Sequence, residues 1–230
     1  MRIREKRRIV QLLGREDFTP TLDELRKLPP AEAVGPLFAG ICQADAAIRW
    51  HAVTAMGWVV AWLAERDMEA ARVVMRRFMW SLNDESGGIG WGAPEAMAEI
   101  MVRHAGLAGE YCHMLVSFMR EDGFFIEHEP LQRGLMWAVG RLAESRPALL
   151  RKHEAVRYLL PYLGVEDAEV RGLAAWALGS LRAGEATDAL AELREDPSPL
   201  SLYVDDRLQR TTVGELAEAA LAAIAGQGGG

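Results

Sequence analysis

Apolar residues recur at every third or fourth position along nearly the whole chain, a spacing typical of amphipathic helices. Strands that are buried on one face would instead alternate apolar and polar residues, and no convincing stretch of that kind is found. The pattern therefore predicts an all-α protein. A first helix is expected around residues 4–13 and a short second one at 22–28, which Pro29 and Pro30 end.

The helices that follow are expected to come in repeated pairs. Small residues close similar segments at Gly57, Ala98, Gly140 and Gly179, with separations of 41, 42 and 39 residues (98 − 57, 140 − 98 and 179 − 140). A period of this length is the signature of a helical repeat protein. The pairs are expected at 31–42 with 45–65, 67–82 with 94–105, 107–121 with 128–144, 146–163 with 168–182, and 185–195 with 211–225.

The domain organisation follows from this period. The 230 residues divide into roughly five repeats. Because each repeat of such a protein touches mainly its neighbours, one elongated domain covering 1–230 is expected. Residues 1–30 would form an N-terminal helical cap, 31–225 the repeats, and the glycine-rich 226–230 a flexible tail.

Two repeats carry Asp, Arg and Gly in register, at 45–57 and 167–179. Both aspartates lie where a helix N-cap is expected. The pattern Asp-x-x-x-Arg-x-x-Ala-x-x-Ala-Leu-Gly, matched best at 167–179, resembles a HEAT repeat of the type shared with phycobilin lyases, and the likeness covers about 31–225. The resemblance implies a HEAT-like solenoid, a right-handed α-α superhelix whose second helices line the concave face. It also implies that the shared residues form a structural ladder between repeats, made of Asp45, Arg49, Asp167 and Arg171.

The second helices of the pairs are also expected to carry a binding stripe. Successive helical residues turn by about 100°, so the residue three before each small residue points away from the core. Steps of three and four extend this open stripe. Its candidate binding residues are Trp50, His51, Trp58, Glu95, Glu99, Arg133, Trp137, Arg141 and Trp176. The alternative is that some of these rings pack under neighbouring loops or helices.

The second repeat breaks the pattern with a glycine-rich segment. Its N-cap should fall at Ser86, 12 residues before Ala98, but four glycines follow within 86–93. Pro94 and Glu95 look like a first helical turn, so this helix should start roughly two turns late and leave a loop at 81–93. The loop is similar to one in uncharacterised bacterial HEAT-like proteins. We expect it to act in recognition, with Trp91 beside an acidic edge that favours a basic partner segment; the edge comprises Asp84, Glu85, Glu95 and Glu99. The alternative is that Trp91 plugs the core.

Composition narrows the classes of partner and compartment. The formal net charge of −7 and a pI near 5.4 disfavour nucleic acid, because duplex binding needs a basic face. Cys42 and Cys112 form no CxxC pair and predict neither a disulfide framework nor a thiolate zinc site. No signal-like or membrane-spanning run is found. The sequence thus predicts a cytoplasmic protein that does not engage a membrane.

No catalytic, cofactor or metal site is predicted. The pairs His128-Glu129 and His153-Glu154 resemble those that hold two irons in HEAT-repeat deoxyhypusine hydroxylase, but their register in the helices differs. No cysteine or serine nucleophile lies beside a plausible base.

We therefore predict a protein-interaction scaffold or adaptor that binds a peptide or helix of a partner protein through the concave face and the 81–93 loop. A small ligand is the lesser alternative. Two other functions stay open: a HEAT-like DNA glycosylase acting on alkylated bases, with Glu95 or Glu99 as the catalytic carboxylate, and a tetrapyrrole lyase or chaperone.

Overall fold

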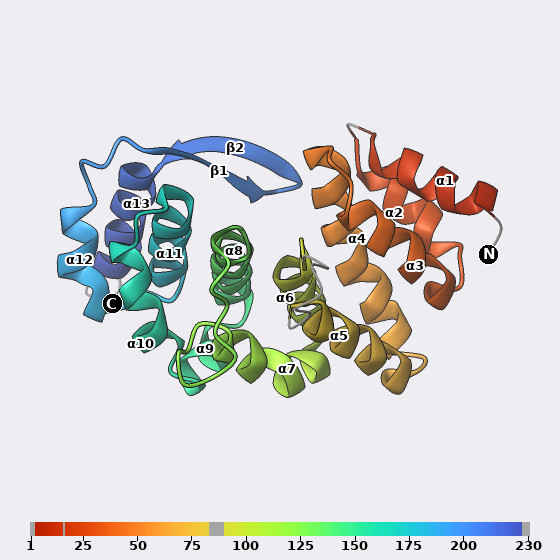
Figure 1. Ribbon diagram of the computed structural model, residues 1–230, viewed down its shortest axis with the longest axis horizontal. Helices are drawn as coiled ribbons and strands as arrows, with labels where there is room; N and C mark the ends of the chain where they lie inside the picture. The colour runs from red at the N-terminus through yellow and green to blue at the C-terminus, as the bar shows by residue number, and fades with distance from the viewer. Residues whose placement is uncertain (1–2, 16, 83–89, 227–230) are drawn as a thin grey trace. The chain divides into compact units, whose positions relative to one another are not determined.

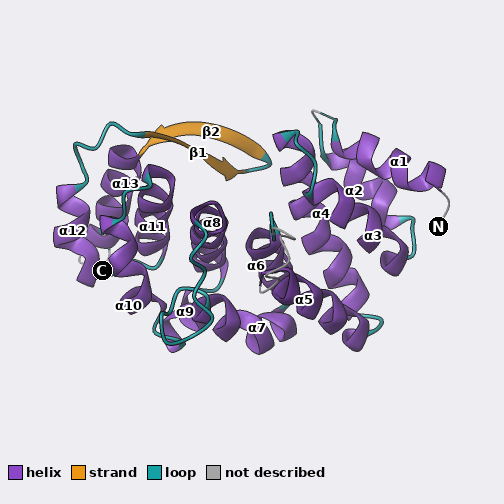
Figure 2. Cartoon of the chain, viewed as in Figure 1, coloured by secondary structure: helices purple, strands orange, loops and turns teal. Residues whose placement is uncertain are grey.

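The computed structural model describes residues 3–15, 17–82 and 90–226 (Figure 1). The chain forms two compact units: unit 1 comprises residues 1–108 with 205–207, and unit 2 comprises 109–204 with 208–230. The described residues are mainly helical, as Figure 2 shows. The all-α, solenoid-type repeat fold expected from the sequence is confirmed. The expectation of a single domain stays a prediction.

Unit 1 is built around one long helix. Its helices are α1 (Ile3–Leu13), α2 (Thr19–Arg26), α3 (Pro30–Ile41), α4 (Ala46–Ala64), α5 (Met68–Leu82) and α6 (Ala93–Arg103). α4 packs against α3, α5 and α6, and its residues 51–57 are buried without interruption. A helix that is apolar on all sides suits such a central position.

Unit 2 stacks helices α8, α11 and α13, with α11 packed against both of the others (Figure 1). Most of α7 lies in this unit, and a two-stranded hairpin, β1 with β2, precedes the last helix. The elements are α7 (Ala105–Ser117), α8 (Glu129–Ser145), α9 (Pro147–Lys152), α10 (Ala155–Leu159), η1 (Leu160–Gly164), α11 (Ala168–Ser180), η2 (Gly184–Ala186), α12 (Thr187–Glu192), β1 (Pro199–Val204), β2 (Arg207–Thr212) and α13 (Val213–Ala225).

The small residues that define the repeat lie where consecutive helices approach most closely. A Cβ atom on Gly57 would lie 2.8 Å from the backbone oxygen of Glu99, and one on Gly179 would lie 2.6 Å from Cα of Ala220. A Cβ on Gly140 would clash with the ring of Trp176. Within each unit, the 39- to 42-residue period of the sequence thus reflects the packing of α4 on α6, of α8 on α11 and of α11 on α13.

One pair of strands was not found in the sequence: residues 199–212 form the hairpin (Figure 2). In β1, Leu200 and Leu202 are buried and Ser201 is exposed, but β2 is exposed along most of its length and gives no alternating signal. Asp205 and Asp206 both have positive φ, as a tight hairpin turn requires. The chain between α12 and α13 therefore contains both strands, and β1 begins at Pro199.

The expected helix at 146–163 is also divided. It consists of α9, α10 and η1, and the break lies at Glu154, whose φ of 58° is left-handed. Most other expected helices begin and end within a few residues of the observed ones, although the helix expected at 185–195 consists of η2 and α12 and ends at Glu192.

Candidate functional site

The ladder between repeats exists in unit 2. Asp45 and Asp167 cap their helices as expected, accepting hydrogen bonds of 3.0 Å from the amides of Ile48 and Val170. Arg133 donates to Asp167 at 2.6 Å. Burial opposes ionisation of Asp167, but the hydrogen bonds from Arg133 and Val170 outweigh it and lower the pKa of this carboxyl.

A second rung joins Arg171 to Asp196 at 2.7 Å. Hydrogen bonds from Ser198 and Arg171 lower the pKa of Asp196 to about 2. Each arginine thus reaches an aspartate of the following repeat. Arg133, expected in the binding stripe, is a ladder residue. Gln132 precedes Gly140 by eight residues, as Arg171 precedes Gly179 (140 − 132 and 179 − 171), but it instead donates to the backbone oxygen of Ile126.

In unit 1 the ladder is interrupted at Arg49. Arg49 precedes Gly57 by eight residues, as Arg171 precedes Gly179 (57 − 49 and 179 − 171). Among the described residues, however, Arg49 forms no ion pair. The expected N-cap of the next second helix, Ser86, lies outside those residues. That helix, α6, begins only at Ala93, so the late start read from the sequence is confirmed.

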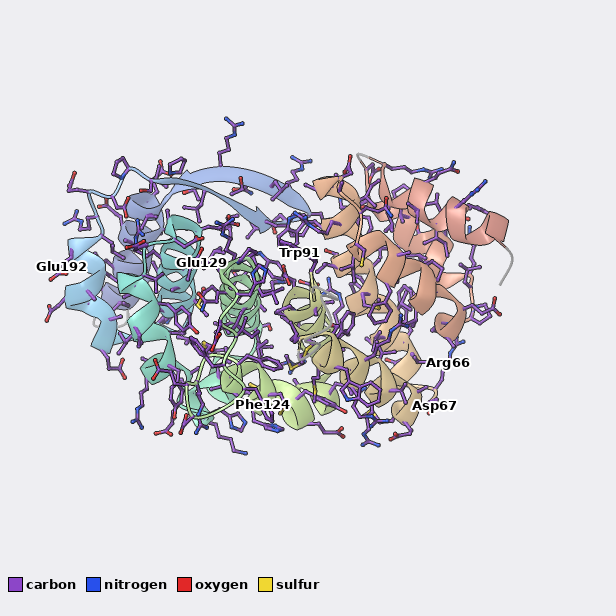
Figure 3. The ribbon with its side chains drawn as sticks, in the orientation of Figure 1. Arg66, Asp67, Trp91, Phe124, Glu129 and Glu192 are labelled. Atoms are coloured by element: carbon purple, nitrogen blue, oxygen red, sulfur yellow. The ribbon has the colours of Figure 1, made fainter. Side chains whose placement is uncertain are left out.

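Arg49 instead lines a cavity of about 240 Å³ with Trp91 and the end of α3, namely Ile41, Cys42, Gln43 and Ala44. Trp91 is 41% exposed and lies at the N-terminal end of α6 (Figure 3). The alternative that it plugs the core is therefore wrong. Gly92 fixes this position, because its φ is 70° and a Cβ there would lie 2.5 Å from Cγ2 of Ile41.

The residues just before and just after the segment 83–89 approach each other. A Cβ on Gly90 would lie 2.9 Å from the backbone oxygen of Ser81, so the residues on either side of the segment 83–89 are in contact. Trp80, which is 74% exposed, and Trp91 flank this contact. We call Ile41–Ala44, Arg49, Trp80 and Trp91 the Trp91 edge. Asp84 and Glu85 lie outside the described residues.

Of the other stripe candidates in unit 1, only Trp58 is exposed, at 38%, with the Arg103 guanidinium 4.8 Å from its ring. Trp50 and Glu95 are half-buried. His51 is buried, stacks on Phe18, and its Nδ1 lies 2.7 Å from the backbone oxygen of Leu13. The open position expected for His51 is thus wrong, because α1 and the segment after it cover that side of α4.

Glu99 is also not on a solvent-facing stripe. It is only 2% exposed and forms an ion pair with Arg103, one turn further along α6. The reason is that α6 packs directly on α4 at Gly57. The acidic edge expected beside Trp91 therefore loses one of its four members.

In unit 2 the two tryptophans of the stripe are packed. Trp137 is 2% exposed and donates a 2.8 Å hydrogen bond from Nε1 to the backbone oxygen of Tyr203 in β1. Trp176 is half-buried against Gly140. Arg141 lies 3.3 Å from Glu144 in a half-exposed ion pair. The open-face prediction is wrong for Trp137, and the alternative of packing under a neighbouring segment applies to it.

Metal-binding residues do not gather in the part of the chain that the structure describes, where no group of three or more His, Cys, Asp or Glu side chains could hold an ion. The His113 and His153 rings lie 6.2 Å apart, and burial, followed by the charges of His113 and Lys152, lowers the pKa of His153. Burial raises the pKa of the Cys112 thiol to about 12, so it is not a reactive thiolate.

Repeated helix pairs, close helix contacts at small residues and an Asp–Arg ladder define an α-solenoid repeat protein. Consistent with this class, residues 129–181 match the family model for a HEAT-like repeat. An uncharacterized protein of Archaeoglobus fulgidus is 27% identical over 193 residues, which cover 84% of this chain and 95% of that protein. That relative is archaeal, whereas the loop resemblance had pointed to bacterial proteins.

Similar solved structures include designed repeat proteins. A designed armadillo repeat protein superposes with a TM-score of 0.54 at 20% identity, covering 94% of this chain and 98% of the other. Another, solved in complex with the peptide (KR)4, has a TM-score of 0.53 at 20% identity, covering 96% of this chain and 99% of the other. These likenesses establish the fold. Within the described ranges, no helix combines the length and apolar character needed to cross a membrane.

Proposed function

We propose that this protein is a binding scaffold that takes a peptide or helix of a partner protein at the Trp91 edge of unit 1. The observation that carries the proposal is Arg49. The corresponding ladder position in unit 2, Arg171, is satisfied by an aspartate of the next repeat, whereas Arg49 lies beside an exposed tryptophan in a cavity of about 240 Å³.

The chemistry of the Trp91 edge indicates what the partner presents. A guanidinium prefers a carboxylate, which it can bind through two parallel hydrogen bonds. Tryptophan and arginine dominate the binding energy of many protein interfaces. A partner segment that places an Asp or Glu at Arg49 and an apolar side chain on Trp91 and Trp80 would complete the interrupted ladder from outside the chain.

The comparisons support the binding of a peptide, but the charge of the peptide that we propose is different. A designed armadillo repeat protein of similar fold binds the basic peptide (KR)4. The basic partner expected from the sequence relied on an acidic edge that included Glu99, and Glu99 is buried in an ion pair. Arg49 therefore favours an acidic segment here.

The alternative functions receive less support. A glycosylase needs an accessible carboxylate, and of its two candidates Glu99 is paired with Arg103, which leaves Glu95. A tetrapyrrole chaperone would use the aromatic stripe, but Trp137 is packed under β1.

The test is a selection of random displayed peptides on the whole protein, followed by affinity measurement of the enriched sequences by fluorescence polarisation. We expect acidic peptides with apolar neighbours, and we expect Trp91→Ala and Arg49→Gln each to weaken binding by about tenfold. Two exposed residues of unit 1 away from the Trp91 edge give matched controls, Val73→Ala for the tryptophan and Arg66→Gln for the arginine. Enriched peptides that bind both edge variants as tightly as the controls would contradict the proposal.

A further inference from the structure

Unit 2 contains a larger cavity that the binding stripe did not include. Its volume is about 610 Å³, and it lies between the segment after α7 and the helices α10 and η1. Met119, Phe125, Pro161 and Val165 give it an apolar lining. Cavities of about 300–1,000 Å³ with an apolar lining and a few polar groups are typical of small-molecule sites.

A buried hydroxyl without a partner belongs to this cavity. Tyr162 lines it and is only 4% exposed, and its hydroxyl forms no hydrogen bond with any described residue. Burial, and secondly the charge of Glu121, raise the pKa of Tyr162 to about 12. The hydroxyl is therefore neutral at physiological pH and can donate a hydrogen bond. Buried polar groups without partners are rare, and ligand binding is one explanation for them.

Two exposed charged side chains also line the cavity, Glu121 and Arg157. Arg120 and Asp122 neutralise each other through hydrogen bonds of 2.9 and 2.8 Å. The guanidinium of Arg157 lies 5.6 Å from the centre of the Tyr158 ring and pairs with no carboxylate in the described ranges. Glu121 likewise pairs with no cation there. The cavity is therefore lined by a solvent-exposed cation, a solvent-exposed anion and one buried hydroxyl without a partner.

From this set we infer that the cavity binds a small zwitterion with an apolar body, such as an α-amino acid with a large apolar side chain. The ligand carboxylate pairs with Arg157, its ammonium pairs with Glu121, and the Tyr162 hydroxyl donates to a ligand oxygen. The side chain packs on Met119, Phe125, Pro161 and Val165. The inference is independent of the proposed scaffold function, because every residue it uses lies in unit 2.

Three probes that share a phenyl ring separate the contributions of the two charges: L-phenylalanine carries both, phenylpropionate only the carboxylate, and phenethylamine only the ammonium. Isothermal titration calorimetry on the full chain at neutral pH should show L-phenylalanine binding about tenfold more tightly than either analogue. Arg157→Gln should weaken L-phenylalanine and phenylpropionate but leave phenethylamine unchanged. Glu121→Gln should weaken L-phenylalanine and phenethylamine but leave phenylpropionate unchanged.

Tyr162→Phe keeps the ring and removes only the hydroxyl, and we expect it to weaken L-phenylalanine binding by about fivefold or more. Lys152→Gln removes an exposed cation of unit 2 that does not line the cavity, and it should have no effect. Circular dichroism on each variant verifies that the helices are retained. The inference is overturned if none of the probes binds the wild-type protein, or if L-phenylalanine binds all three cavity variants as tightly as Lys152→Gln.

Discussion

The indole Nε1 of Trp137, in the middle of α8, donates a 2.8 Å hydrogen bond to the backbone oxygen of Tyr203, 66 residues later in β1. The two rings also lie 6.2 Å apart. The hairpin therefore covers a tryptophan that the repeat pattern would leave open. At this position the aromatic residue stabilises unit 2.

The first prediction concerns that contact. Trp137→Ala should lower the free energy of unfolding by about 3–5 kcal/mol, because it removes a buried aromatic ring and the hydrogen bond to Tyr203. Trp80→Ala, at a side chain that is 74% exposed, should stay within about 0.5 kcal/mol. Urea denaturation followed by circular dichroism measures both. Equal losses for the two variants would show that the hairpin does not protect Trp137 in solution.

The second prediction concerns the pH dependence of the ladder. The pKa of Asp196 is held at about 2, below its unfolded value near 4, so its contribution is full above about pH 4 and is lost as the pH falls through about 2. Asp196→Asn should therefore cost about 1–2 kcal/mol at neutral pH, since the pair with Arg171 is partly solvated, and nearly nothing at about pH 2.

The control for the ladder is Asp23→Asn, at an exposed aspartate of unit 1. It should change the free energy of unfolding little at either pH. Unfolding by urea at several pH values gives the comparison. A loss for Asp196→Asn that stays constant down to the lowest pH would mean that the carboxylate charge is not the cause.

The third prediction concerns the unpartnered hydroxyl. Tyr162→Phe should raise the stability of the ligand-free protein by about 1 kcal/mol, because a buried hydroxyl without a hydrogen bond is costly. Tyr158→Phe, at a half-buried ring in the same cavity, should be nearly neutral. Thermal denaturation without added ligand measures both changes. Clear destabilisation by Tyr162→Phe would mean that the hydroxyl does have a partner in solution.

The fourth prediction concerns the backbone that places Trp91. Gly92→Ala should destabilise unit 1 by about 1–3 kcal/mol, because alanine is strained at a φ of 70° and its Cβ would meet Ile41 at 2.5 Å. Gly109→Ala, inside α7 with nothing within 4 Å of the added atom, should instead stabilise by about 0.5–1 kcal/mol. The same urea denaturation distinguishes the two signs. A neutral Gly92→Ala would indicate that the turn before α6 relaxes easily.

The sequence by itself determined the features that depend on neighbouring residues. The N-caps at Asp45 and Asp167 and the late start of α6 follow from interactions within one helical turn, so a local pattern is enough to find them. The spacing of the small residues also revealed the repeat, because a close approach of the next packed helix recurs at Gly57, Gly140 and Gly179.

Only the tertiary structure decided which faces of the helices are exposed to solvent. The partner of Trp137 comes from β1, and β2 has no alternating pattern that could have predicted a hairpin there. Arg133 rather than Gln132 reaches Asp167. Neighbouring residues of a helix point about 100° apart, so an error of one residue in aligning the repeats changes which side chain is expected in the ladder. The cavity around Tyr162 joins residues from three separate segments. Such relationships depend on how distant segments pack, and no periodicity within a single segment encodes them.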